Sequence, residues 1–200
     1  GTLDSHVAPS GQGVGRFEVR TPVAVTGVRG TRFRVQAGAH GARSEVIDGS
    51  VRLQPHAPNH SAGRVVAVPT GFGAAVGADG VLSGVRPLLP APQLGAPQRA
   101  GSGQWTTAVS PVPGAVAYQV QVSRDAEGLE LTSSSQFNTP DIRFAAPGGG
   151  TYYVAVRAID AVGLHGRDAH LTFEGASVLM TVSGLPVALS DGGAVMLADY

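Results

Sequence analysis

The chain has 200 residues, with 14 basic and 14 acidic side chains and no cysteine. This charge balance does not favour a nucleic-acid partner or an anionic membrane surface. The absence of cysteine excludes thiol catalysis and cysteine-ligated metal, and since every basic residue is arginine, chemistry that needs a lysine amine is excluded too. No apolar run is long enough to span a membrane, and the first 30 residues lack the pattern of a signal peptide.

The first part of the chain has the pattern of β-strands. Residues 17–25 and 32–37 alternate apolar and polar side chains with a period of two. The five arginines of residues 16–38 fall mostly on the polar side of this alternation, whereas Phe17 and Phe33 fall on the apolar side, so the arginines do not alternate with aromatic residues on one face as base stacking would require. We therefore expect these arginines to form a solvated sheet face rather than a phosphate-binding loop.

Turn signals separate the strands that follow. Asp48-Gly49, within residues 44–54, is a strong hairpin dipeptide and predicts two paired strands around it. Residues 64–69 predict a further strand, and residues 71–85 predict glycine-rich turns with short strands. We expect no helix in this region.

A proline-rich stretch divides the sequence. Residues 87–101 contain four prolines, which lack backbone donors and therefore suit an extended connector rather than a central sheet. We predict a first domain over residues 1–86, a linker over 87–101, a second domain over 102–175 and an apolar tail over 176–200.

The second domain is predicted as a β-sandwich. From Trp105 onward, about seven short alternating segments are separated by turns such as Pro147 to Gly150. The alternation places one set of large apolar residues on a common inward face. This predicted core consists of Trp105, Tyr118, Val120, Val122, Tyr152, Val154 and Val156.

The first half carries motifs of a known family. VRTPVAVTGVRGTRFRV followed by EVIDGSVRL resembles the C-terminal part of a FecR-type domain over roughly residues 14–86, most specifically at Thr21-Pro22 and Arg29-Gly30-Thr31. Such a domain normally has an earlier half with its own strands, whereas only residues 1–15 precede the resemblance. The likeness therefore implies a FecR-like β-roll or partial β-sandwich whose first half is missing.

The second half resembles a fibronectin type III-like sandwich through PGAVAYQVQVSRD and GTYYVAVRAIDAVGLHG. This likeness implies that Trp105 is a core residue and that Tyr152 is the tyrosine-corner residue. Such sandwiches often follow FecR domains in envelope proteins of Gram-negative bacteria. The two resemblances together imply an all-β protein that is extracellular, on the cell surface or in the periplasm.

Two segments partly match catalytic or cofactor motifs. Residues 71–77, GFGAAVG, follow a strand as a dinucleotide loop does, but Asp79-Gly80 turns the chain where that loop needs a helix. Serines 133–135 lack the glycines of a nucleophile elbow. We expect neither a cofactor site nor a catalytic serine, and we predict that the chain is not an enzyme.

Four histidines are candidate metal ligands. His56 and His60 are four residues apart, but Pro55 and Pro58 prevent the helix that would make them a metal-binding pair. His165 and His170 lie near two aspartates, Asp160 and Asp168, around a turn. We expect a solvated loop there, with a weak cation or sugar site as the alternative, and we predict no metal site.

The tail is apolar and has no obvious place in a completed sandwich. Residues 176–200 contain no Lys, Arg or Glu and read as three short strands, which would promote aggregation if they were left exposed. The tail could cover its own domain, begin a further domain or add a strand to a neighbouring subunit. The candidate association residues are Val178, Leu179, Met180, Val182, Val187, Leu189, Val195, Met196 and Leu197.

These patterns favour a non-enzymatic structural component of the bacterial envelope or exterior. It would assemble with itself through β-strand addition, as a homo-oligomer, polymer or filament. The alternative is a periplasmic ligand-binding or sensing module of FecR type. Neither role involves a cofactor, nucleic acid or a membrane-spanning segment, and the sequence identifies no small-molecule ligand.

Overall fold

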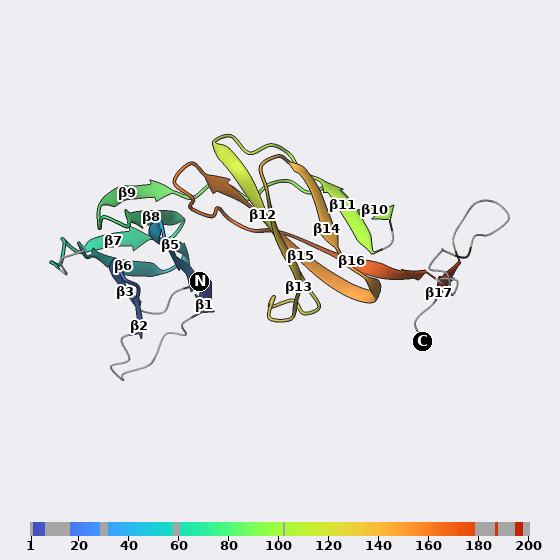
Figure 1. Ribbon diagram of the computed structural model, residues 1–200, viewed down its shortest axis with the longest axis horizontal. Helices are drawn as coiled ribbons and strands as arrows, with labels where there is room; N and C mark the ends of the chain where they lie inside the picture. The colour runs from blue at the N-terminus through green and yellow to red at the C-terminus, as the bar shows by residue number, and fades with distance from the viewer. Residues whose placement is uncertain are drawn as a thin grey trace. The chain divides into compact units, whose positions relative to one another are not determined.

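The computed structural model describes residues 2–6, 17–28, 32–57, 61–101, 103–178, 187 and 195–197. These residues form antiparallel strands and no helix, which confirms the predicted all-β class (Figure 1). Across this part of the chain, no helix meets the length and hydropathy needed to cross a membrane.

The chain divides into two compact units. Unit 1 consists of residues 1–90 together with residues 159–167, and unit 2 consists of residues 91–158 and 168–200. Residues 159–167, called the inserted loop below, begin with the last two residues of the strand at 148–160 and lie within the predicted second domain, 102–175. Unit 1 is therefore discontinuous in sequence.

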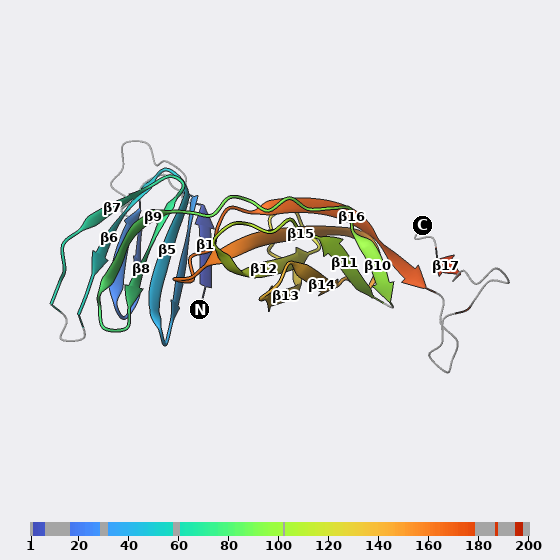
Figure 2. The ribbon, with the colours of Figure 1, turned by 90° about the horizontal axis from the view of Figure 1, so that it is seen from above.

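Unit 1 is built from two antiparallel sheets, drawn as adjoining layers in Figure 2. The first sheet has the order β1-β4-β5-β8-β9, and the second has the order β2-β3-β6-β7. The first comprises β1 (Thr2–His6), β4 (Arg32–Gly38), β5 (Gly41–Asp48), β8 (Phe72–Gly77) and β9 (Leu82–Pro87). The second comprises β2 (Phe17–Arg20), β3 (Ala24–Val28), β6 (Ser50–Pro55) and β7 (Val66–Pro69). Alternate apolar residues of both sheets form one core that includes Phe33, Val46, Val76, Val51, Leu53 and Val68.

The predicted hairpin at Asp48-Gly49 is wrong. β5 before it belongs to the first sheet and pairs with β4, whereas β6 after it belongs to the second sheet and pairs with β3. Gly49 has a φ of 83°, and its N–H donates to Asp48 Oδ1 at 3.0 Å. Val46 and Val51 are both buried in the shared core, so the chain turns a corner between the sheets and continues burying apolar side chains. The dipeptide marks the turn, but it does not decide which strands pair.

Unit 2 contains a three-stranded sheet and a five-stranded sheet. Their orders are β10-β11-β14 and β13-β12-β15-β16-β17. The strands are β10 (Gln98–Gly101), β11 (Gln104–Ala108), β12 (Ala115–Ser123), β13 (Leu131–Phe137), β14 (Asp141–Ala145), β15 (Gly148–Asp160), β16 (Ala169–Val178) and β17 (Met196–Leu197). The end of the predicted linker thus joins a sheet edge as β10, after its last proline, Pro97.

The predicted core register of unit 2 is confirmed. Tyr118, Val120, Val122, Tyr152, Val154 and Val156 are buried, and Trp105 is half-buried. Phe173 of β16 lies among the aromatic residues, with ring centroids 4.6 Å from Trp105 and 5.5 Å from Tyr152. The Tyr152 hydroxyl donates to the carbonyl of Pro147, five residues upstream, as in a tyrosine corner.

A buried polar cluster also lies within unit 2. Arg157 of β15 forms an ion pair with Asp168, with Nε 2.7 Å from Oδ1, and donates to Gln121 Oε1 of β12 at 2.5 Å. Both charged side chains are almost fully buried, so each depends on the other for compensation. Asp168, considered above as part of a cation site, therefore has a structural partner.

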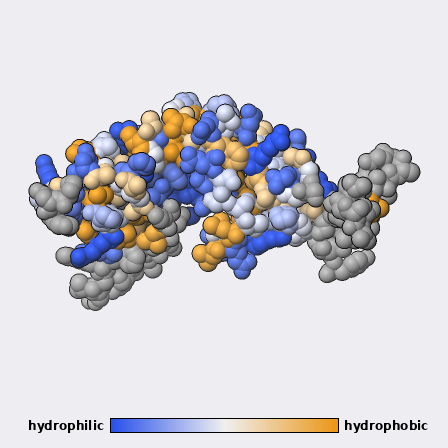
Figure 3. Space-filling model, viewed as in Figure 1, coloured by the Kyte–Doolittle hydropathy of each residue, from blue (hydrophilic) through white to orange (hydrophobic). Residues whose placement is uncertain are grey.

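On the face drawn in Figure 3, hydrophobic and hydrophilic residues are interspersed over each unit.

Candidate functional site

The inserted loop is a closed turn held by its own residues. Asp160 Oδ1 accepts hydrogen bonds from the N–H groups of Val162 and Leu164, both at 2.9 Å. The Asp160 backbone also bonds Leu164 O and Gly163 N, and Ile159 and His165 form an isolated β-bridge. Gly163 has a φ of 80°, which suits glycine at this turn. The Asp160 carboxylate thus organises the loop.

Two charged side chains of unit 1 hold this loop. Arg34 on β4 and Glu45 on β5 lie directly opposite each other in the sheet, and both are 0% exposed. Arg34 Nη2 donates to Gly166 O at 2.8 Å, and Glu45 Oε1 accepts from His165 N at 3.1 Å. Both side chains recognise main-chain atoms, so these two contacts do not depend on the loop's side chains.

The predicted solvated arginine face is wrong at Arg34. The period-two alternation correctly turns Arg34 away from the core between the two sheets, and Arg32 on the same strand is exposed. The inserted loop covers the sheet at Arg34, although the bonded residues are 132 positions apart in sequence. Sequence reasoning missed Arg34 and Glu45 because alternation says which face a side chain takes, but not what covers that face.

The loop adds apolar and further polar contacts. Leu164 is 1% exposed and packs where β8 has Gly73: a Cβ there would lie 3.1 Å from Leu164 Cδ2 and 2.9 Å from Leu88 Cδ2. Arg167 N donates to Leu89 O at 2.9 Å. The glycine-rich stretch 71–77 is therefore mostly a strand, and Gly73 gives the loop room to approach the sheet.

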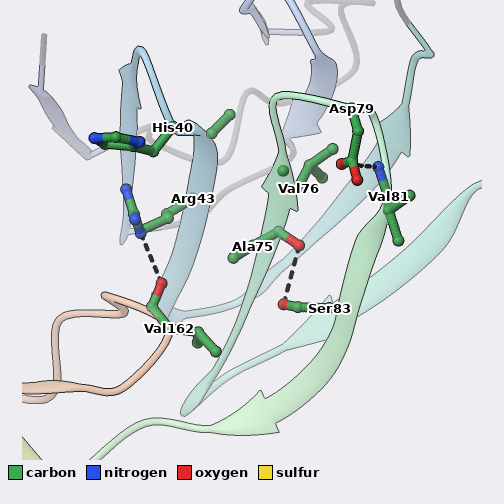
Figure 4. A pocket seen from close by; sticks show the side chains of 10 residues that line it. His40, Arg43, Ala75, Val76, Asp79, Val81, Ser83 and Val162 are labelled. Carbon is green, nitrogen blue, oxygen red and sulfur yellow. Dashed lines mark hydrogen bonds between the residues drawn. The ribbon is translucent and has the colours of Figure 1, made fainter.

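A pocket of about 300 Å³ lies beside this contact (Figure 4). Its residues come from the β4–β5 turn, β5, β8, the β8–β9 turn, β9 and the inserted loop; they are His40, Ala42, Arg43, Ala75, Val76, Gly77, Asp79, Val81, Ser83 and Val162. Arg43 Nε donates to Val162 O at 2.9 Å, so one lining residue bonds directly to another that belongs to the loop. Asp79 Oδ1 accepts from Val81 N at 3.0 Å, and Ser83 Oγ donates to Ala75 O at 3.1 Å.

The histidines weighed as metal ligands do not converge. His56 forms a β-bridge with Ala62, whereas His60 lies outside the described residues. His165 contributes its main chain to the Glu45 contact, and His170 lies on β16. Among the residues that the structure describes, no group of three or more His, Cys, Asp or Glu side chains could hold a metal ion.

The serines weighed as nucleophiles lie on β13 and make structural contacts. Ser133 Oγ donates to Ala145 O at 3.2 Å, and Ser134 Oγ accepts from Gln119 Nε2 at 2.9 Å. Both contacts tie β13 to neighbouring strands of unit 2. The structure thus gives these hydroxyl groups a place in sheet packing.

The predicted association residues fall partly within the described chain. Val178 ends β16 and pairs with Met196 of β17, while Ser177 pairs with Leu197. Val195 N donates to Val187 O at 2.9 Å. Leu179, Met180, Val182 and Leu189 lie outside the described residues. The described parts of the tail therefore pair within their own chain, and association through the tail remains a prediction.

Comparison with known proteins bears on the N-terminal part. The family described as FecR protein matches residues 1–52, which supports a FecR-type domain there. The match begins at residue 1 rather than near residue 14 and ends within β6, so it includes β1 and the three loop-contacting side chains Arg34, Arg43 and Glu45. No curated protein matches the chain.

Proposed function

We propose that the chain is a non-enzymatic binding or sensing module of FecR type in the envelope of a Gram-negative bacterium. The family match over residues 1–52 supports the FecR-type part of this proposal, and FecR proteins are associated with the envelope. It also favours sensing over the structural, self-assembling role.

The observation that carries the proposal is that the pocket and the contact between sheet and loop have two residues in common. Arg43 and Val162 both line the pocket, and they are hydrogen-bonded to each other. A molecule in this pocket would touch both the sheet of unit 1 and the inserted loop. A ligand shifts a conformational equilibrium only if it binds one conformation more tightly than the other, and a ligand that touches both the sheet and the loop would bind more tightly when the loop is in place. The pocket and the loop therefore provide the two parts that a sensing module needs.

We further propose that unit 2 is a fibronectin type III-like domain. Its three-stranded and five-stranded sheets, its alternating core and the Tyr152–Pro147 hydrogen bond support this likeness. In the chain, β15 and β16 of this domain flank the inserted loop. The second domain would therefore be the source of the segment that completes the FecR-type unit.

Amide NMR of the full chain tests whether the pocket binds. A mixture of free amino acids, dicarboxylates, monosaccharides and nucleosides is added, and the signals of Val162, Gly163 and Val81 are followed. We expect at least one compound class to shift all three signals saturably. Ser83→Trp, which adds a large ring at the pocket, should abolish the shifts, while Ser135→Trp on exposed β13 should preserve them. If no compound shifts these signals, the pocket does not serve sensing.

Self-assembly through the tail is the rival hypothesis. Its support is the apolar composition of residues 176–200, which lack Lys, Arg and Glu. The pairing of β17 with β16 instead fits a tail that packs on unit 2 of its own chain. The two roles differ in what removal of the tail does to the mass of the particle in solution.

A further inference from the structure

On the basis of this proposed function, we infer that the pocket takes a small zwitterion of amino-acid type, whose carboxylate binds Arg43 and whose ammonium group binds Asp79. We also infer that Arg43 transmits the presence of this ligand to the inserted loop.

The charges of the pocket suit a dipolar molecule. Arg43 supplies a guanidinium and Asp79 a carboxylate to its lining, which also includes His40, and Figure 4 draws Arg43 and Asp79 on either side of Val76. A simple anion would meet repulsion from Asp79, and a simple cation would meet repulsion from Arg43. A molecule that carries both charges would have an end of opposite charge for each of these two groups.

The shape of the pocket suits a compound with a short apolar part. Ala42 and Val76 are buried, and Ala75 is 9% exposed, whereas His40, Asp79 and Ser83 are exposed. The apolar floor and polar rim would receive an aliphatic side chain below and the charged ends above. A volume of about 300 Å³ is at the lower end for ligand pockets, which favours a compound no larger than an amino acid.

Both charged groups retain bonding capacity for such a ligand. Arg43 uses Nε for Val162 O, and a guanidinium has four further N–H donors that can bind a carboxylate in a forked arrangement. Asp79 accepts one bond from Val81 N, and a carboxylate has about four acceptor positions.

Arg43 couples ligand binding to the loop because its rigid, planar guanidinium would bind the ligand through the Nη atoms and already binds Val162 O through Nε. A carboxylate bound to the Nη atoms would fix the guanidinium in the orientation that presents Nε to Val162 O. The Arg43 side chain also lies against Gly163, where an added Cβ would come within 2.5 Å of Nε. Ligand binding would therefore hold the loop more firmly on the sheet, and the loop amides would exchange more slowly with solvent.

Three related compounds test the charge pattern: L-leucine, N-acetyl-L-leucine without the ammonium charge, and L-leucinamide without the carboxylate. They are titrated into the full chain by amide NMR, with hydrogen exchange of Val162 and Leu164 measured in parallel. We expect L-leucine to bind saturably and slow exchange, and each analogue to bind about tenfold more weakly.

Variants test the assigned residues. Arg43→Gln should weaken L-leucine about tenfold and end its effect on exchange, and Asp79→Asn should weaken it similarly while keeping the side-chain oxygen for Val81 N. Arg52→Gln and Asp141→Asn, both exposed and outside the pocket, should bind as the parent does.

The outcomes separate this inference from the proposed function. Equal binding of all three compounds, binding of L-leucine without slower loop exchange, or binding only of another compound class overturns the inference and leaves a sensing pocket. If none of these compounds and none of the earlier mixture binds, both are overturned.

Discussion

Replacing Arg34 by methionine tests whether unit 1 depends on the inserted loop. The change keeps an unbranched side chain with an apolar stem but removes the guanidinium and its 2.8 Å bond to Gly166 O, and a hydrogen bond from a charged group contributes about 1.5–3 kcal/mol. It also leaves Glu45, which is 0% exposed, without the cation opposite it on β4. We therefore expect the free energy of unfolding of unit 1 to fall by about 3 kcal/mol, near the lower limit for breaking a buried charge pair.

The two units can be followed separately during urea unfolding. The single tryptophan, Trp105, and all four tyrosines lie in unit 2, so tryptophan fluorescence reports unit 2 alone. Amide NMR signals of β4 and β5 report unit 1. Arg32→Met is the matched control, because Arg32 is on the same strand but exposed.

Adding Glu45→Gln to Arg34→Met gives a further check on this reasoning. The double variant removes both buried charges, so it should lose less stability than the sum of the two single variants, by about 1 kcal/mol or more. A loss below about 0.5 kcal/mol for Arg34→Met, the range of ordinary surface changes, would refute the argument.

Further predictions concern unit 2. Trp105→Ala should lower its free energy of unfolding by about 3 kcal/mol, because the ring packs 4.6 Å from Phe173; circular dichroism measures this, and a loss near zero would contradict the assigned register. Burial raises the pKa of Tyr152 above its ordinary value of 10.0, although Arg124 opposes this, so Tyr152 favours the folded state below pH 10 and loses this effect as pH rises through the raised pKa. In urea unfolding measured at increasing alkaline pH, Tyr152→Phe should reduce the decrease in the free energy of unfolding. If the decrease is the same as in the parent, other groups cause it. Deleting residues 179–200 should lower the melting temperature of unit 2 and leave its mass in light scattering monomeric if β17 covers its own chain, whereas a folded monomer formed from an assembled parent would establish association through the tail.

The period-two pattern predicted most strands because each buried face had to alternate with a polar one. In unit 2 it placed Tyr118, Val120 and Val122 of β12 in the core, where they are. It could not predict how strands are shared between sheets, so Asp48-Gly49 was assigned to a hairpin instead of a corner. The FecR-like resemblance agrees with the family match over residues 14–52, but it placed the start near residue 14, whereas the match begins at residue 1.

The candidate site was not predictable from local sequence, because its parts are distant in the chain. Arg43 and Val162 are 119 positions apart, and no local spacing connects them. Asp160 and His165 were noticed as neighbours of a turn, yet their polar groups organise the loop and bind Glu45 rather than a cation. Charged residues opposite each other on adjacent strands, as at Arg34 and Glu45, could have signalled a covered surface only once the pairing of β4 with β5 was known.

The discontinuity of unit 1 imposes an order on folding during synthesis. A ribosome makes residues 1–90 well before residues 159–167, so the strands of both sheets of unit 1 have been synthesised while the segment that covers Arg34 and Glu45 does not yet exist. Arg34 and Glu45 of the nascent unit 1 therefore stay hydrated until nearly all strands of unit 2 have left the ribosome. A chain that terminates before residue 167 would therefore carry an incompletely covered first unit, which proteases that remove unfinished products could recognise.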